Sequence, residues 1–198
     1  MIGEVVAAIR AGQPVVVPTD TVYGFGADAF HEAPVRQLYR LKGRARGQPI
    51  ALVAADVGVL LDAVPELREA EAAIRALLPG PYTLILPNPE RRFPWLTGER
   101  PTTIGVRVPA LGGDGSEVLR QVCAIAATSA NSPGGPDPRR VDEIPEELRE
   151  ACGAVLDVGE LPGTPSTVLD LTAPDPVVVR EGAVPAEEAI ERLSAARG

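Results

Sequence analysis

Hydroxyl, carboxylate and phenol groups gather directly after the first apolar run of the chain. Val15 to Val17 is a β-branched segment that predicts a buried strand, and Pro18 ends it because proline cannot donate to a sheet ladder. The polar side chains that follow are Thr19, Asp20, Thr21 and Tyr23, succeeded by Gly24 and Gly26. Polar groups in a turn at a strand end are typical of binding sites. Taken alone, the triplet Thr-Asp-Thr is equally typical of a turn that hydrogen-bonds its own backbone.

Positive charge is concentrated in one short segment of an otherwise acidic chain, whose net charge is −8. From residue 36 to residue 49 the sequence has no acid and five cations, namely Arg36, Arg40, Lys42, Arg44 and Arg46. Lys42 is the only lysine, and a lysine ammonium is a compact point charge often used on phosphates. The segment therefore predicts an anion-binding loop. The alternative is the chance survival of one lysine in an arginine-rich chain.

Polar clusters recur at the ends of four predicted strands, at Thr19–Tyr23, Thr128–Asn131, Ser166–Thr167 and Arg180. If these strands share one sheet, their ends can converge on a single crevice with Lys42 and Arg44 at its rim. Such a crevice would hold cations and hydroxyl groups together.

The elements that would position these groups follow from hydrophobic periodicity and from turn residues. Helices are predicted over residues 3–11, 32–42, 65–78, 115–121 and 142–152 and from residue 185 onward. Strands are predicted over residues 15–17, 50–54, 83–86, 104–108, 123–127, 154–158, 168–171 and 177–179. Residues 88–102 and 132–140 are predicted loops. The first is long enough for a lid, although Trp95 is more typical of a residue that packs such a loop down.

Length and composition, with 45% of the residues hydrophobic, indicate one domain spanning residues 1–198 or two small ones, and the predicted helices and strands make it an α/β protein. The acidic balance argues against nonspecific binding to nucleic acid or to anionic membranes. Glu4 stands where a signal peptide would be basic, and no apolar run reaches membrane-spanning length, so a cytoplasmic protein is expected.

The few sulfur and imidazole side chains predict no metal site. Cys123 and Cys152 are the only cysteines and His31 is the only histidine, too few for the usual zinc ligands. Cys123 lies in an apolar run, which predicts a buried and unreactive thiol, and neither cysteine is assigned a role. His31 is expected at the surface.

Seven short blocks occur in a specific order along the chain. They are Pro18–Gly24 (PTDTVYG), Lys42–Arg44 (KGR) with Pro49 five residues on, Pro79–Thr83 (PGPYT), Gly105–Pro109 (GVRVP), Ser129–Asn131 (SAN), Ser166–Val168 (STV) and Arg180–Gly182 (REG). Together they resemble the YrdC/Sua5 family of threonylcarbamoyl-adenylate synthases, in its short single-domain form, over about residues 3–184. The resemblance implies a YrdC-like twisted mixed sheet with flanking helices around a deep, positively lined cavity.

The resemblance also implies a nucleotidyltransferase. L-threonine, bicarbonate and ATP would give L-threonylcarbamoyl-AMP and pyrophosphate, and downstream transferase proteins would use the product for the t6A modification of tRNA. Threonine's amine and bicarbonate form a carbamate whose oxygen attacks the α-phosphorus, so the reaction needs charge neutralisation and positioning more than a strong base. Mg²⁺ is expected to arrive with ATP.

Site residues are carried over from the same blocks. Those expected on ATP are Lys42, Arg44, Gln48, Thr103, Ser129, Asn131 and Arg180, with Lys42 and Arg44 as the catalytic pair. Those expected on threonine are Thr19, Thr21, Tyr23, Arg107 and Ser166. Charge agrees for Arg107, since a carboxylate in an apolar site needs a cation. The alternative for Arg107 is an exposed strand face.

Three positions depart from the family pattern. Gln48 stands where the family commonly has asparagine, Asp137 where some relatives have a serine near the nucleotide, and Val53 near the position where some have a histidine that contacts threonine.

Two other functions remain open. One is an RNA-binding or ribosome-associated module of the same fold, which would use the basic segment. The other is a paralogue that makes a different carbamoyl- or acyl-adenylate.

Overall fold

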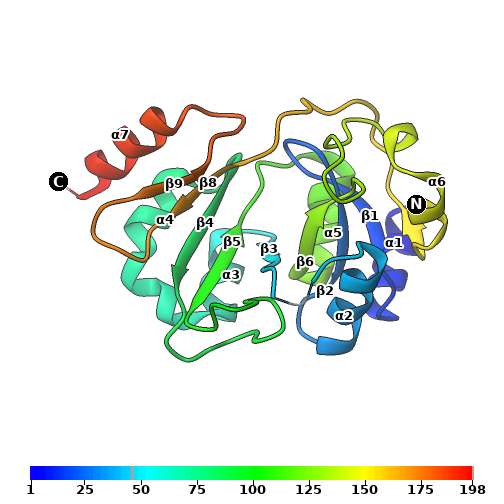
Figure 1. Ribbon diagram of the computed structural model, residues 1–198, viewed down its shortest axis with the longest axis horizontal. Helices are drawn as coiled ribbons and strands as arrows, with labels where there is room; N and C mark the ends of the chain where they lie inside the picture. The colour runs from blue at the N-terminus through cyan, green and yellow to red at the C-terminus, as the bar shows by residue number, and fades with distance from the viewer. Residues whose placement is uncertain (46, 198) are drawn as a thin grey trace.

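The computed structural model describes residues 1–45 and 47–197, so Arg46 of the predicted basic segment lies outside the described residues. The described residues form a nine-stranded sheet in the order β7-β1-β2-β6-β3-β5-β4-β8-β9 (Figure 1). Its strands are β1 (Val15–Pro18), β2 (Tyr23–Asp28), β3 (Ala51–Ala54), β4 (Tyr82–Pro87), β5 (Thr103–Arg107), β6 (Ala124–Ser129), β7 (Ala154–Val155), β8 (Thr167–Asp170) and β9 (Val177–Arg180). β1 with β7, β3 with β5 and β4 with β8 are parallel pairs, and the other neighbours are antiparallel. The sheet is therefore mixed, as the resemblance implies.

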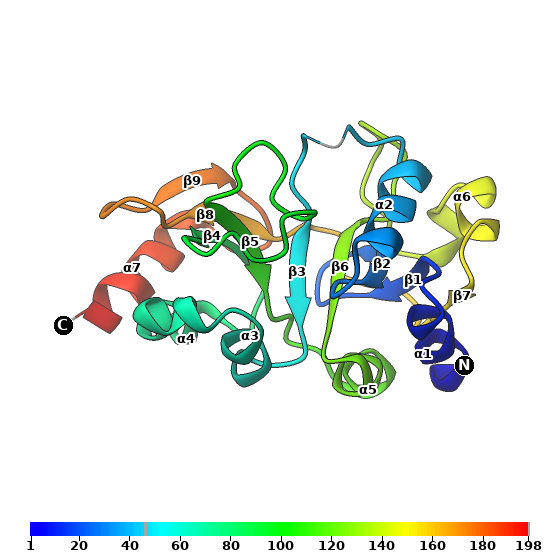
Figure 2. The same cartoon turned by 90° about the horizontal axis from the view of Figure 1, so that it is seen from below.

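Helices flank this sheet on both sides. They are α1 (Ile2–Arg10), α2 (Glu32–Leu41), α3 (Val57–Ala63), α4 (Glu71–Leu77), α5 (Gly113–Val122), α6 (Glu146–Glu150) and α7 (Ala186–Arg197), with 3-10 turns at Pro65–Ala70 and Val141–Glu143. Figure 2 shows α1, α3, α4 and α5 together on the lower side of the view and α2 on the upper side. The two chain ends lie at opposite ends of the molecule (Figure 1). None of the helices that the structure describes combines the length and the apolarity needed to cross a membrane.

On two central strands, alternation separates core residues from functional groups. On β4 and β5, Leu84 and Val106 are fully buried in the main core, whereas Thr83, Gly105 and Arg107 lie on the opposite face. Because successive side chains of a strand point to opposite faces, the period of two separates these sets without any irregular backbone.

Small residues on four central strands leave room above this second face. They are Gly24 on β2, Ala127 on β6, Ala51 on β3 and Gly105 on β5. Gly24 is close to its neighbour, since a Cβ there would lie 3.1 Å from the Thr128 carbonyl oxygen. At Gly105, which lines a cavity, such a Cβ would make an ordinary van der Waals contact, 3.9 Å from Ala51 Cα.

The sequence predicts a flexible turn at Gly24 and Gly26, which is wrong, because both lie within β2. β2 pairs with β1 on one side and with β6 on the other, and two-sided pairing outweighs the low strand propensity of glycine. Gly26 also has a packing role, since a Cβ there would lie 2.9 Å from Ile125 Cδ1.

The prediction also misses α3 and places two helices as single units. α3 has a side-chain cap, because the Asp56 carboxylate accepts the Val59 N–H at 2.8 Å. The predicted helix over 65–78 is a 3-10 turn followed by α4, and the one over 142–152 is a 3-10 turn followed by α6. Pro145 separates the last two, since proline has no N–H to continue a helix.

Cys123 is exposed and does not belong to a buried strand, contrary to the prediction. It follows α5 with φ 67°, a left-handed conformation that ends the helix, and β6 begins one residue later. Packing of Trp95 is confirmed: its indole Nε1 donates to the Ala29 carbonyl at 2.8 Å, and its ring meets Phe93 edge to face.

Candidate active site

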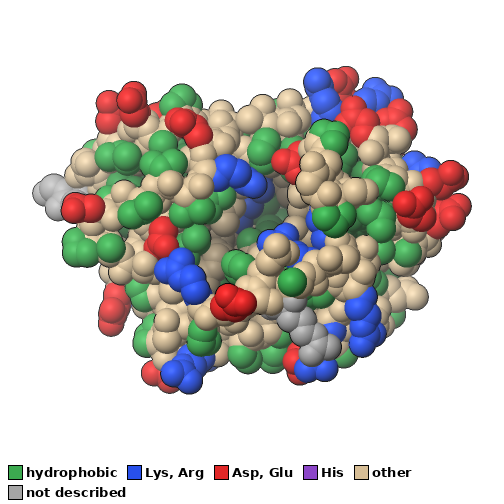
Figure 3. All heavy atoms as spheres, viewed as in Figure 1, with side chains coloured by type: hydrophobic (Ala, Val, Ile, Leu, Met, Phe, Trp, Pro, Cys, Tyr) green, Lys and Arg blue, Asp and Glu red, His purple; other side chains and the backbone are tan. Residues whose placement is uncertain are grey.

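A cavity of about 330 Å³ opens on the face of the sheet that carries the small residues. Its polar lining consists of Thr19, Arg44, Thr83, Arg107, Thr128, Ser129, Asp137, Ser166 and Arg180. An adjoining hollow of about 440 Å³ has five polar lining residues, Lys42, Arg44, Gln48, Ser129 and Asn131. Arg44 and Ser129 belong to both, so the two spaces meet at these residues. Figure 3 shows a hollow in the middle of this face with Lys and Arg side chains around it.

Arg107 is held from one side by the turn that joins β1 to β2. Its Nη2 donates to the Thr21 hydroxyl at 2.8 Å and to the Thr19 hydroxyl at 3.4 Å, and forms an ion pair with Asp20. Its Nε is buried with no hydrogen-bond partner among the described residues. Burial lowers the pKa of Arg107, and the Asp20 carboxylate opposes this shift. A guanidinium that is fixed on one side and unpaired on another is suited to a carboxylate.

Arg44 is a second, half-buried guanidinium whose Nε nitrogen is buried and unpaired. It follows Gly43, whose φ of 59° ends α2. Nη1 donates to the Thr128 hydroxyl at 3.0 Å and Nη2 to the Pro49 carbonyl at 2.9 Å, while Nε is buried without a partner in the described part of the chain. Burial lowers the pKa of Arg44. This side chain is therefore a fixed positive charge at the junction of the two spaces.

Lys42 lies at the C-terminal end of α2 and is only 6% exposed. Its Nζ donates to the Ser129 carbonyl at 2.8 Å and to both the carbonyl and the side-chain oxygen of Asn131. Burial lowers the pKa of Lys42 to about 8; the positive charge of Arg44 adds to the shift and the carboxylate of Asp137 opposes it. These three acceptors match the three protons of the ammonium group. An anion in the hollow therefore interacts with Lys42 through its charge alone, or it replaces one of these hydrogen bonds.

Arg180 lines the cavity from β9. Its Nη2 donates to the Ser166 carbonyl at 2.7 Å and to the Ser166 hydroxyl at 3.2 Å. The Ser166 hydroxyl in turn lies 2.9 Å from the Thr83 hydroxyl. Gly182 allows this close approach, because a Cβ there would lie 2.3 Å from the Pro165 carbonyl oxygen.

The structure brings most of the predicted site residues together. Thr19, Arg44, Arg107, Ser129, Ser166 and Arg180 line the cavity, and Lys42, Gln48 and Asn131 line the adjoining hollow. Thr21 is fully buried and reaches the site through its hydrogen bond to Arg107. Segments more than 150 residues apart in the sequence, from Thr19 to Arg180, therefore meet at one cavity.

Besides Thr21, two predicted residues lie outside the described lining of both spaces. The Tyr23 ring packs in the main core, and its hydroxyl donates to the Gly159 carbonyl at 2.7 Å. Thr103 begins β5, and its hydroxyl donates to the Arg100 carbonyl at 3.0 Å. These hydroxyl groups stabilise the protein's own loops, so the geometry gives no support to their expected ligand contacts.

Four residues at the site are missing from the predicted ligand contacts. Thr83, Thr128 and Asp137 line the cavity, and Asp20 pairs with Arg107 behind it. The alternation of β4, with Leu84 and Leu86 in the core, could have found Thr83. The sequence gives no comparable indication that Asp20 pairs with a residue 87 positions away.

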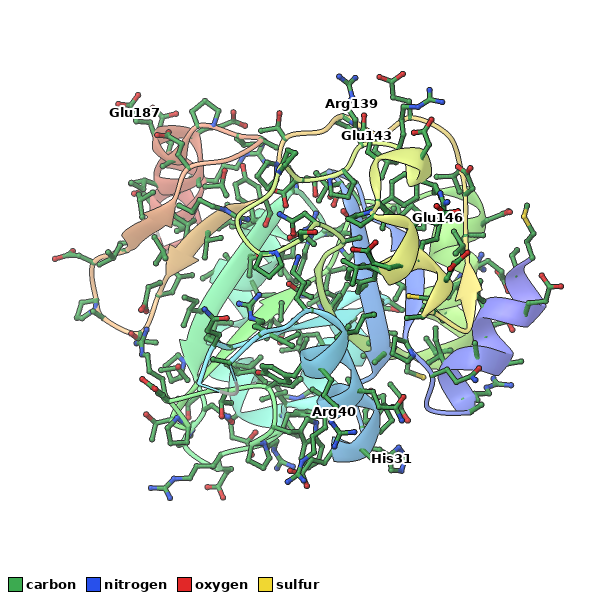
Figure 4. The ribbon with its side chains drawn as sticks, turned by 45° about the vertical axis from the view of Figure 1, so that its right-hand side comes forward. His31, Arg40, Arg139, Glu143, Glu146 and Glu187 are labelled. Carbon is green, nitrogen blue, oxygen red and sulfur yellow. The ribbon has the colours of Figure 1, made fainter. Side chains whose placement is uncertain are left out.

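The remaining titratable groups stand apart from this site. His31 is at the surface, as predicted, where it points away from the molecule (Figure 4), and its Nδ1 lies 2.6 Å from the Asp28 carboxylate. Burial raises the pKa of Cys152 to about 12, which leaves its thiol unreactive. Among the described residues, no three His, Cys, Asp or Glu side chains group together as a metal site.

Comparison with known proteins agrees with the sequence blocks. The family model named for Sua5, YciO and YrdC, with the description telomere recombination, matches residues 7–182. The threonylcarbamoyl-AMP synthase of Pyrococcus abyssi is 38% identical over 189 residues, which cover 93% of this chain and 54% of that protein. The threonylcarbamoyl-AMP synthase of Stenotrophomonas maltophilia is 38% identical over 168 residues, which cover 80% of this chain and 86% of that protein. The chain thus spans about half the length of the first relative and most of the second.

Solved structures give the same assignment for the fold. P. abyssi Sua5 complexed with L-threonine superposes with a TM-score of 0.86 at 35% identity, covering 96% of this chain and 56% of that one. Escherichia coli YciO superposes with a TM-score of 0.79 at 28% identity, covering 94% of this chain and 91% of that one. The ordered blocks, the mixed sheet and these matches show that the chain belongs to the Sua5/YciO/YrdC family.

Proposed function

We propose that this protein is a threonylcarbamoyl-AMP synthase, a nucleotidyltransferase that joins L-threonine, bicarbonate and ATP and releases pyrophosphate. The observation that carries the proposal is that three guanidinium groups from distant segments, those of Arg44, Arg107 and Arg180, line one cavity. Nearby cations disfavour one another's charged form, as Arg180 does for Arg107, so this cluster is best explained by anionic ligands. Two anions, a carboxylate and a phosphate, are what the two organic substrates of this reaction supply.

Threonine would bind beside Arg107. The carboxylate would accept from the unpaired side of the guanidinium, whose other side is fixed by Thr21. The Thr19 hydroxyl lines the same part of the cavity, with the apolar side chains of Val22 and Val53 nearby to contact a methyl group. Val53 offers no hydrogen bond, so the hydroxyl of the substrate would have to use other groups.

ATP would extend from the cavity into the adjoining hollow. Arg180 and Arg44 would contact its phosphates in the first, and the ammonium of Lys42 would lie close to them in the second. The apolar side chains of Ile85 and Val168, on β4 and β8, offer a surface for the base. Three cations around one triphosphate would neutralise the charge that repels the attacking carbamate.

The reaction follows from this placement. The threonine amine and bicarbonate give a carbamate with loss of water, and a carbamate oxygen then attacks the α-phosphorus while the bond to pyrophosphate breaks. Because the carbamate is already an anion, no residue needs to remove a proton in the second step. The cavity also limits access of water, which would hydrolyse the mixed anhydride.

Mg²⁺ would accompany ATP as part of the substrate. The donor groups of the site do not form a resident metal centre, since Asp137 is the only acid in the described lining of either space. The phosphates of ATP would hold the ion, and Asp137 could supply one oxygen.

The basic segment gives little support to the RNA-binding alternative. Its two cations in the described lining, Lys42 and Arg44, line the adjoining hollow. Lys42 donates a hydrogen bond to Asn131 and Arg44 donates one to Thr128, so they are not presented to an external phosphodiester backbone. The product would instead pass to transferase proteins that modify tRNA in the cytoplasm.

The test is pyrophosphate release from ATP, with L-threonine and bicarbonate omitted in turn. Release that requires both supports the proposal, and the adenylate should appear as a product of matching amount by mass spectrometry. Release that is indifferent to threonine, or a product built on another amino acid, would overturn it.

A further inference from the structure

Asp20 connects two loops directly behind the cavity that Arg107 lines. Its side chain is 9% exposed and is absent from the lining residues, so it does not itself meet a ligand there. One carboxylate oxygen pairs with Arg107 Nη2, and the other accepts the Ala110 N–H at 2.9 Å. Ala110 follows β5 by three residues, so Asp20 ties the β1–β2 turn to the loop after β5.

This carboxylate fixes one end of the Arg107 guanidinium. Every hydrogen bond that the described residues make with Arg107's guanidinium ends on Nη2, and the acceptors are Asp20, Thr21 and Thr19. Nε is buried and unpaired, and Nη1 makes no hydrogen bond to the described protein. The planar fork is therefore anchored at one corner and keeps its other donors for the cavity.

Asp20 also compensates the charge of an arginine that is almost completely buried. Arg107 is 8% exposed, and Arg180 adds a second positive charge that disfavours its protonated form. Thr19 and Thr21 contribute neutral hydroxyl groups. Asp20 is therefore the one anionic partner of Arg107 among the described residues.

We propose that Asp20 is a positioning residue for amino-acid binding: it orients Arg107 and keeps its unpaired donors aimed at the substrate carboxylate. This inference rests on the proposed function, because it takes the ligand of Arg107 to be an α-carboxylate. A purely structural Asp20 would stabilise the turn without affecting threonine selectively. The two roles therefore differ in what they do to the two substrates.

The experiment measures L-threonine and ATP affinities by calorimetry for the wild type, Asp20→Asn, Arg107→Met and the double variant. Asparagine is nearly isosteric but lacks the charge that orients the fork. Asp20→Asn should weaken threonine binding about tenfold and change ATP affinity less than about twofold, as expected for loss of one charge-assisted contact. In the Arg107→Met background the same change should alter threonine affinity less than about twofold, since Asp20 acts through Arg107.

Steady-state kinetics and a control variant complete the test. Asp20→Asn should raise KM for threonine about tenfold with kcat within about threefold of the wild type. Asp157→Asn is the matched control, because Asp157 is an exposed acid that accepts from the Tyr23 hydroxyl of the same hairpin at 3.2 Å and does not contact Arg107. It should leave both affinities unchanged.

The outcomes separate the two hypotheses. If the wild type does not bind threonine, the proposed function fails before Asp20 is tested. If the wild type binds threonine and Asp20→Asn binds it equally well, or if both substrates weaken together, the positioning role is overturned. Should Asp20→Asn not fold, Asp20→Glu, which keeps the charge but moves it by one methylene, must still show a loss of affinity confined to threonine.

Discussion

Replacing Lys42 by methionine should abolish activity and yet stabilise the folded protein near neutral pH. Lys42 is buried, and its pKa falls from 10.5 to about 8. That shift of about 2.5 units corresponds to about 3 kcal/mol of unfavourable free energy for carrying the charged ammonium in the folded state. Methionine has a similar length and no charge, so it removes this cost.

The lost hydrogen bonds offset part of the gain. The Ser129 and Asn131 carbonyl oxygens would lose their ammonium donor, at about 1–2 kcal/mol together once water from the hollow replaces it. The net stabilisation expected at pH 7 is about 1–2 kcal/mol, or roughly 2–8 °C in Tm for a chain of this size.

The pH dependence of the stability difference between Lys42→Met and the wild type shows whether the buried charge of Lys42 causes it. Below pH 8 the lysine is protonated in both the folded and the unfolded states, so the full cost is present. Between pH 8 and 10.5 the unfolded chain still binds a proton that the folded state has lost, and the stability of the wild type therefore rises with pH relative to the variant. From pH 7 to pH 9.5 the advantage of Lys42→Met should fall by about 2 kcal/mol.

Urea unfolding followed by the fluorescence of Trp95, the single tryptophan, measures this difference. Burial raises the pKa of Tyr23, Tyr39 and Tyr82, and since these residues are common to both proteins their titration cancels from the difference. Arg40→Met is the control, because Arg40 is an exposed cation of the same helix and should change stability by less than about 0.5 kcal/mol. A Lys42→Met variant that is less stable than the wild type at pH 7, or a difference that does not change with pH, would refute the reasoning.

Three further substitutions probe other parts of the site. Gly105→Val should reduce pyrophosphate release at least about tenfold with little loss of stability, because its side chain would occupy the cavity and its Cβ would make only an ordinary contact with Ala51. A fully active variant in the coupled phosphate assay would contradict this. Arg44→Met should weaken ATP binding about 10- to 100-fold and leave threonine affinity unchanged, as calorimetry would show, since it removes a charged phosphate contact. Tyr23→Phe should cost about 1–2 kcal/mol in urea unfolding, because its hydroxyl bonds Gly159. An effect of Tyr23→Phe on threonine affinity would instead support the expected contact between the Tyr23 hydroxyl and threonine.

The sequence predicts the strand ends well because their pattern is local. Polar residues follow apolar runs at Thr19, Ser129 and Ser166, and all three line the cavity. The alternation of β5 likewise separates Arg107 from the core residues on either side of it. Each of these inferences needs only neighbouring residues and the period of a strand.

The errors arise where tertiary pairing decides. Gly24 is a turn residue by propensity, and only its pairing between β1 and β6 makes it part of a strand. Tyr23 was grouped with its polar neighbours, but once residue 24 faces the cavity, residue 23 must face the core. Asp20 could not be assigned to Arg107, because nothing local connects positions so far apart.

Unpaired buried donors alone do not identify a ligand site. The Tyr82 hydroxyl is also buried without a partner, but it belongs to the packed core beneath the sheet and lines neither space. Arg44 and Arg107 differ in carrying charge and in lining a cavity, so an anionic ligand there can compensate their charge. The free protein therefore bears the cost of these guanidinium groups and of the Lys42 ammonium, and ligands that bind only the folded state relieve it. The same groups that destabilise the empty site supply the binding energy for two anionic substrates.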